Sequence, residues 1–306
     1  MRWLIFLLLA VGAHTNQARG QLAVQLKSEK DTFLVYESIP LTVLIRNLSG
    51  RTIELTAQVN RPWLSFLVSD DSGRIIPALG TPKADGSALI APGQTISRTI
   101  DLLPLFDIRA RGSYRIQVRV DSAGTSAISA PVSLTVINGR EIWSQTAGLP
   151  AKEGAADEYR TYTLIARRAE QEDLLHVSVS DDHHQVVYGV LALGGFITLK
   201  PPDPRIDKEG HLHVLYQVGP RSFGYVVIDP YAKIVNRAIY SDIQSSPRLV
   251  VTDGEVVEQG GEMTYPKPEH VMSENELKPP PPPPPKPKRH WWWPFGGHST
   301  PKQSAP

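Results

Sequence analysis

The chain has 306 residues, a formal net charge of +1 at neutral pH and no cysteine. This length leaves room for two domains and a tail. The lack of cysteine excludes a fold held together by disulfides, so stability must come from apolar cores. A content of 27 prolines and 23 glycines is typical of a β protein rich in turns.

The charge is unevenly distributed along the chain. Residues 1–20 hold Arg2 and Arg19, and residues 278–306 hold five Lys or Arg residues and no acid, which leaves a charge of −6 on residues 21–277. An acidic body argues against nucleic acid as a partner, whereas a basic end indicates a tail with a target of its own.

Residues 1–20 have the pattern of a secretory signal peptide. Arg2 supplies the positive charge, Trp3–Ala13 is an apolar run of 11 residues, and small residues follow it. This run is shorter than the roughly 20 residues that span a bilayer, and no later stretch has the pattern of a transmembrane helix. The segment predicts export, so that the protein is periplasmic, envelope-associated or secreted.

Residues 21–138 predict a first β domain. Apolar and polar residues alternate in Leu22–Leu26, Leu41–Asn47 and Tyr114–Val120, which is the period of a strand with one buried face. Shorter candidate strands lie between them, separated by turn signals, and the total of roughly seven strands is typical of a β-sandwich.

Three segments of this domain follow the order strand, Asn turn, Pro-Gly turn and Gly-x-Tyr strand. They are PLTVLIRNLSGRTIEL at Pro40–Leu55, IAPGQT at Ile90–Thr95 and RGSYRIQVRV at Arg111–Val120. The order resembles that of the bacterial extracytoplasmic immunoglobulin-like domains and is also similar to the BsuPI-type proteinase-inhibitor domain. The resemblance implies an Ig-like sandwich and brings no catalytic residue with it.

Residues 139–265 predict a second, antiparallel β domain that contains a repeat. The strands His211–Gln217 and Gly224–Asp229 form a hairpin, whose segment Leu212–Val214 recurs 37 residues earlier at Leu175–Val177 and 37 residues later at Leu249–Val251. Repeated hairpins usually stack, because one hairpin alone cannot bury its apolar face. Before the hairpins lies the polar stretch Ala147–Glu158, which either separates this domain from the first one or is a surface segment of it.

The architecture of this repeat domain is left open by the sequence. The phrase IDKEGHLHVLYQ at Ile206–Gln217 resembles the opening of a β-propeller blade. Blades run to about 40–45 residues and at least four are needed for closure, so this segment is too short for a complete propeller. It predicts an open repeat sheet, a second sandwich or a partial propeller that another chain completes, and we favour a single compact β domain.

His211 and His213 lie two residues apart on one predicted strand, so both side chains leave the same face. They are candidate metal ligands, to which His183 and His184 could add, although a zinc site needs three or four converging ligands. His176 takes the place of His213 in the earlier repeat, which favours a structural role as a polar residue on the outer face of the strand. No cofactor is predicted.

The end of the chain has a different composition. Residues 266–290 predict a disordered, proline-rich basic linker with seven consecutive prolines, and residues 291–306 form a Trp-rich tail. Indole rings beside basic residues suit a membrane surface, a polysaccharide or a groove on an envelope protein. The candidate binding residues are Lys286, Lys288, Arg289, Trp291, Trp292, Trp293 and Phe295.

The sequence shows no nucleophile elbow, phosphate-binding glycine loop or cysteine nucleophile. We therefore expect no enzyme but an exported binding or scaffold protein, which uses loops of its β domains and the aromatic basic tail. The alternatives are a BsuPI-like proteinase inhibitor and a hydrolase or carbohydrate-binding module on the second β domain. The partner and the oligomeric state stay open.

Overall fold

The computed structural model describes residues 21–57, 62–82, 87–122, 125–150, 157–170 and 172–265. Every regular element in these residues is a β-strand, so the prediction of an all-β fold is confirmed. None of the described residues forms a helix with the length and hydropathy needed to cross a membrane. The chain divides into two compact units, Met1–Pro266 and Lys267–Pro306, and all described strands belong to the first. The predicted signal peptide, proline-rich linker and Trp-rich tail lie outside the described residues.

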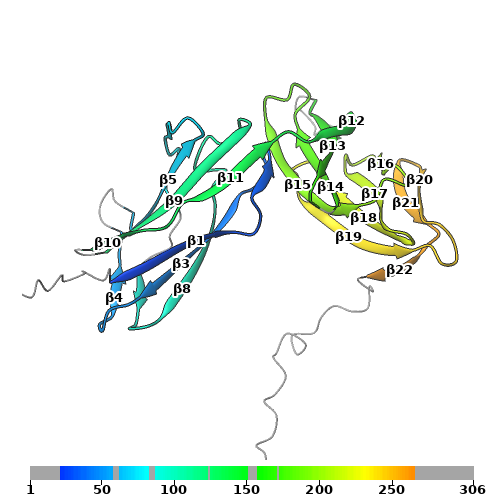
Figure 1. Ribbon diagram of the computed structural model, residues 1–306. Helices are drawn as coiled ribbons and strands as arrows, with labels where there is room; N and C mark the ends of the chain where they lie inside the picture. The colour runs from blue at the N-terminus through cyan, green and yellow to red at the C-terminus, as the bar shows by residue number, and fades with distance from the viewer. Residues whose placement is uncertain are drawn as a thin grey trace, which may run out of the picture. The chain divides into compact units, whose positions relative to one another are not determined.

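The first half of the described chain is a β-sandwich, which we call the N-terminal sandwich (Figure 1). One sheet has the order β1–β3–β8, with bounds Leu22–Ser28, Pro40–Asn47 and Thr95–Asp101. The other has the order β2–β11–β9–β5–β6, with bounds Thr32–Leu34, Val132–Ile137, Gly112–Ser122, Leu64–Asp70 and Ile75–Ile76. The strand β10 (Thr125–Ile128) pairs with β9, and β4 (Ile53–Leu55) pairs with β7 (Ala88–Ile90).

The core of the N-terminal sandwich follows the alternation in the sequence. Leu41, Val43 and Ile45 of β3 are fully buried, as are the apolar residues of β9, while the residues between them are more exposed. Both sheets contribute to one apolar cluster, which includes Trp63. The two sheets therefore bury their apolar faces against each other, as expected for a sandwich.

The second half of the described chain consists of three sheets, which we call the three-layer region. The first is a meander of β12 (Arg140–Gly148), β13 (Tyr159–Arg168), β14 (Asp173–Ser180) and β15 (Val187–Phe196). The second has the order β16–β17–β18–β19–β22, with bounds Asp203–Ile206, Leu212–Gly219, Ser222–Ile228, Ile234–Ser241 and Glu262–Tyr265. The third is the hairpin of β20 (Arg248–Thr252) and β21 (Glu255–Gln259).

The repeat predicted from the sequence corresponds to three hairpins. The segments at Leu175, Leu212 and Leu249 lie on β14, β17 and β20, and each strand pairs with the next strand in an antiparallel hairpin. The hairpins lie in three different sheets. The repeat is therefore a stack of layers that cover each other's apolar faces.

The strand β17 is buried on both faces, although its alternation of apolar and polar residues is that of a strand with one buried face. Leu212, Val214 and Tyr216 pack in a cluster with β13 and β14, while Leu215 packs in a second cluster with Leu249 and Val256 of the third sheet. His213 and Gln217, which share the second face, are also buried. Because the middle sheet is covered on both faces, its strands carry an almost continuous apolar run.

The stretch Ala147–Glu158 does not separate two domains. Its first residues belong to β12, which pairs with β13, and the N–H of Leu149 donates to the carbonyl of Glu158 at 2.7 Å. The described ends of the stretch therefore belong to the hairpin of β12 and β13 in the first sheet of the three-layer region.

Four turns of the described chain share one geometry. Each begins with an aspartate whose carboxylate accepts two backbone N–H groups farther along the turn, as Asp207 does from Glu209 and His211 and Asp229 does from Tyr231 and Lys233. The third residue after each aspartate has a positive φ. The aspartates are Asp70, Asp181, Asp207 and Asp229, and the positive-φ residues are Gly73, His184, Gly210 and Ala232.

Candidate functional site

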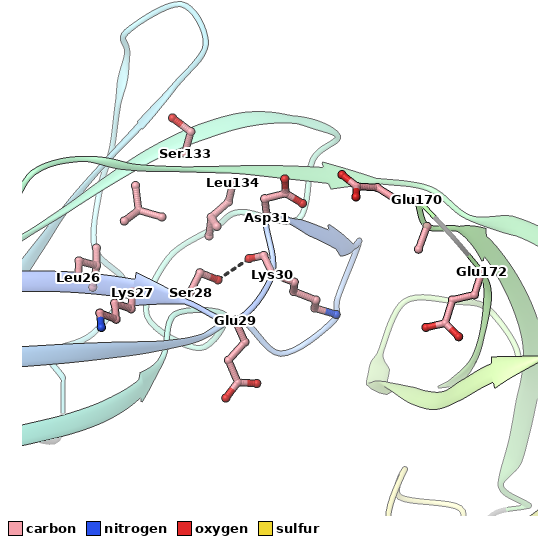
Figure 2. Close-up of a pocket in the computed structure, with 12 residues that line it drawn as sticks. Leu26, Lys27, Ser28, Glu29, Lys30, Asp31, Ser133, Leu134, Glu170 and Glu172 are labelled. Atoms are coloured by element: carbon pink, nitrogen blue, oxygen red, sulfur yellow. Dashed lines mark hydrogen bonds between the residues drawn. The ribbon is translucent and has the colours of Figure 1, made fainter.

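An open pocket of about 850 Å³ is lined by Leu26–Asp31, Val132–Leu134, Ala169, Glu170 and Glu172. Figure 2 shows that the carboxylates of Glu29 and Glu172 point away from Asp31 and Glu170, and the only hydrogen bond drawn joins Ser28 to the backbone of Lys30. The ammonium of Lys30 is held by Glu37 instead. The lining is acidic, since it holds the carboxylates of Glu29, Asp31, Glu170 and Glu172 beside only two lysines.

Glu37 connects the N-terminal sandwich to the three-layer region. It is 5% exposed, its carboxylate accepts the backbone N–H of Leu34 at 2.7 Å, and Lys30 forms an ion pair with it. Nε2 of His176 on β14 lies 3.5 Å from the same carboxylate, but neither ring nitrogen of His176 makes a hydrogen bond. Glu37 also forms an isolated parallel bridge to Val190 of β15.

The surroundings of Glu37 favour its charged form. Burial alone would raise its pKa, but His176, Lys30 and the backbone N–H of Leu34 together lower the pKa to about 2. His176, which is completely buried, does not lie on an outer strand face as the repeat had suggested. Both residues serve as structural contacts between strands that are far apart in the sequence.

His211 and His213, the candidate metal ligands, share the carboxylate of Asp207. Oδ2 of Asp207 lies 3.2 Å from Nδ1 of His211 and 3.1 Å from Nε2 of His213. The other ring nitrogen of His213 lies 2.6 Å from the hydroxyl of Tyr225 on β18. The structure therefore brings the two predicted histidines together, through an aspartate of the turn that precedes them.

This histidine cluster is a hydrogen-bonded network at the edge of the second and third sheets. Burial would raise the pKa of Asp207, but hydrogen bonds from His213 and from the backbone of His211 outweigh burial and lower it. Burial, followed by Glu258, raises the pKa of Tyr225. Across the described part of the chain, no group of three or more His, Asp or Glu side chains is placed to hold a metal ion. Metal binding at His211 and His213 gains no support from these contacts and stays a prediction.

Two exposed tyrosines and one buried arginine form a third cluster, which we call the tyrosine–arginine cluster. The guanidinium carbon of Arg160 lies 4.2 Å from the ring centroid of Tyr188 and 5.5 Å from that of Tyr231. The two tyrosine rings meet edge to face, with centroids 6.1 Å apart and an interplanar angle of 84°. Tyr188 is 36% exposed and Tyr231 is 51% exposed, whereas Arg160 is 3% exposed.

The backbone around the tyrosine–arginine cluster fixes the positions of its members. Arg160 of β13 donates to the carbonyls of Pro230 and Tyr159 and to the carboxylate of Glu158. Tyr231 lies in the turn that begins at Asp229. A Cβ atom at Gly189 would lie 3.0 Å from that of Ala232, so the glycine allows β15 and this turn to approach closely.

The tyrosine–arginine cluster and Glu37 were not predicted from the sequence. Tyr188, Tyr231 and Arg160 come from three strands or turns far apart in the chain, so no spacing marks them. The one local signal is the turn DPYAK at Asp229–Lys233, because a large aromatic residue in the middle of a turn is exposed. The candidate tail residues from Lys286 to Phe295 lie outside the described residues.

No protein-family model matches the chain, and no curated protein matches it in sequence. Among solved structures, the chain is similar to the sporulation control protein Spo0M from Bacillus subtilis, with 14% sequence identity and a TM-score of 0.27. The similarity covers 54% of this chain and 80% of that one. A likeness at this level carries no conclusion about fold family or activity.

Proposed function

We propose that the chain is an exported, non-enzymatic binding or scaffold protein of the bacterial envelope or the secreted fraction. Its β-sheets present a binding surface, and its basic Trp-rich tail provides a second contact. Export is inferred from residues 1–20, and the role of the tail from the lysines, arginine and tryptophans between Lys286 and Trp293.

The tyrosine–arginine cluster supports binding most directly. Tyr and Arg are enriched among the residues that contribute most of the binding energy in recognition surfaces, and tyrosine offers a large contact area at a low entropy cost. In this cluster both tyrosine rings are held by the packing of a buried arginine, so little freedom is lost when a ligand binds. In the histidine cluster, in contrast, both ring nitrogens of His213 and Nδ1 of His211 already have partners inside the protein, in Asp207 and Tyr225.

A pull-down from an envelope extract of the source organism tests this proposal. The chain Gln21–Pro306 is compared with a version that ends at Leu277, and the retained lipids, glycans and proteins are identified by mass spectrometry. A species held by both versions places the binding surface on the β-sheets, and a species held only by the longer version makes the tail the anchor. If neither version retains a specific species, the proposal is wrong.

A second candidate function is inhibition of a proteinase by a loop of an Ig-like, BsuPI-type N-terminal sandwich. The observation that favours the Ig-like assignment is Tyr114, near the start of β9, whose hydroxyl donates to the carbonyl of Ala110 at 2.8 Å. A tyrosine bonded to the backbone a few residues upstream is a hallmark of Ig-like sandwiches. Assays of the purified chain against a panel of proteinases test this function, and no inhibition at a tenfold molar excess over any of them would contradict it.

A further inference from the structure

We propose that the tyrosine–arginine cluster binds a neutral glycan chain through the rings of Tyr188 and Tyr231. This inference rests on the proposed binding function and names the class of ligand that the cluster takes. It follows from the charge, the hydrogen bonding and the size of the cluster.

The electrostatics of the cluster disfavour a charged ligand. The guanidinium of Arg160 already lies over the ring of Tyr188, at the place that a ligand cation would take in a cation–π contact. The charge of Arg160 is compensated by Glu158, whose carboxylate lies 2.8 Å from a guanidinium nitrogen. An anionic ligand therefore meets no uncompensated positive charge, and a neutral ligand fits best.

The polar groups of the cluster suit a ligand with many hydroxyl groups. Within the described part of the chain, neither the hydroxyl of Tyr188 nor that of Tyr231 makes a hydrogen bond to the protein, although both rings are packed. Each tyrosine thus offers an apolar ring edge or face together with a hydroxyl that can both donate and accept. Sugar rings present the matching pair of surfaces, since they carry C–H groups on their faces and hydroxyls around their rims.

The size of the cluster argues against a protein partner. Two tyrosines that are exposed by one third to one half leave a surface on the order of 200 Å². A stable protein interface buries about 800 Å² on each partner. A surface of this size instead matches one or two sugar rings, and a longer glycan can extend from it along the surface.

Arg160 acts here as a positioning residue. Its Nε donates to the carbonyl of Pro230 at 3.0 Å, which ties β13 to the turn that carries Tyr231. Next to Tyr231, Ala232 has a φ of 60°, a conformation that costs a non-glycine residue free energy. The chain therefore holds Tyr231 beside Tyr188 with a rigid and locally strained turn.

Isothermal titration calorimetry on the full chain tests the inference with three neutral probes, cellohexaose, chitohexaose and maltohexaose. We expect at least one of them to bind, and we expect Tyr188→Ala and Tyr231→Ala each to weaken that binding by about tenfold or more. Tyr265, which is 64% exposed and lies on β22 away from the cluster, provides the control, and Tyr265→Ala should bind as the unchanged chain does. Tyr188→Phe and Tyr231→Phe keep the rings and should lose only the contribution of the hydroxyls.

Three outcomes would overturn the inference. The first is that none of the three oligosaccharides binds, at concentrations that would reveal a dissociation constant in the millimolar range. The second is binding that the two alanine variants leave unchanged. The third is binding of a decaproline peptide, used as a fourth probe, without binding of an oligosaccharide; this result would make the cluster a peptide site and leave the proposed binding function standing. That function fails separately, in the pull-down.

Discussion

Asn47 shows how one residue can determine a turn of the N-terminal sandwich. Its side chain is completely buried, its amide donates to the carbonyls of Arg51 and Ile90, and its carbonyl accepts from the N–H and the hydroxyl of Ser49. All of the polar groups of this side chain are therefore used inside the protein. Asn47 begins an Asn-x-Ser acceptor pattern for glycosylation, but its amide nitrogen is not accessible to such a modification.

Replacement of Asn47 by alanine should strongly destabilise the protein. Asn47→Ala leaves the buried carbonyl of Ile90 and the half-buried N–H of Ser49 without this partner, and an unsatisfied buried group costs about 1–3 kcal/mol. We expect the free energy of unfolding to fall by about 2–4 kcal/mol in urea denaturation. Asn236→Ala, at an exposed position of β19, is the matched control and should change it by less than about 0.5 kcal/mol. Equal effects of the two substitutions would contradict the role given to Asn47.

The histidines also differ in role although they belong to the same repeat. His213 finds hydrogen-bond partners in Asp207 and Tyr225, whereas His176 is buried without any and lies beside Glu37. Matching positions in a repeat thus share the strand but not the environment of the side chain. The surroundings of each residue come from the sheet that covers it.

At the scale of the elements, the recurring aspartate turn explains how the hairpins close. A turn of three or four residues like these has a positive φ near its end, which glycine adopts without a steric cost. Gly73 and Gly210 fulfil this need, but His184 and Ala232 occupy the same position with φ values of 55° and 60°. The aspartate that accepts two N–H groups at the start of each turn compensates for part of this strain.

Two opposite substitutions test the strain in these turns. Ala232→Gly should raise the free energy of unfolding by about 0.5–1 kcal/mol, because it relieves a left-handed alanine. Gly73→Ala should lower it by about 1 kcal/mol, since a Cβ atom there meets nothing within 4 Å and only the backbone is strained. Both changes are measured by chemical denaturation. Shifts of the same sign in the two proteins would contradict this interpretation.

At the scale of the whole described chain, Glu37 is a contact that depends on pH. Its pKa is lowered from 4.5 to about 2 in the folded protein. A carboxyl group with a lowered pKa contributes stability that is fully present above the pKa of the unfolded chain and is lost as the pH falls through the folded value. The stabilisation is therefore complete above about pH 5 and disappears as the pH falls towards 2.

The substitution Glu37→Gln isolates this effect from the titration of other carboxylates. At pH 7 the variant should be less stable by up to about 3 kcal/mol, and between pH 5 and pH 2 its free energy of unfolding should fall less steeply than that of the unchanged chain. Urea denaturation at a series of pH values gives both quantities. Parallel curves for the two proteins would show that Glu37 titrates normally and that its contacts do not matter for stability.

Much of the fold could be predicted from the sequence, because local patterns determine it. The alternation in β3 and β9 reports one buried face directly, and the spacing of turn residues reports the hairpins, since both effects act between residues close in the chain. The repeat at Leu175, Leu212 and Leu249 likewise indicated hairpins that stack. The weakest signals came from short edge strands such as β16 and β22, which have few residues to form a pattern.

Only the tertiary structure decided which side chains meet. The second face of β17 is buried by the hairpin of β20 and β21, which follows it by about 30 residues. Because that face carries polar residues, the sequence of the strand gave no sign that it is covered. The contact of Glu37 with His176 and the meeting of Arg160, Tyr188 and Tyr231 join segments that are remote in the sequence. Local propensity and periodicity carry no information about such contacts, because the sheets that create them form only when distant strands pack.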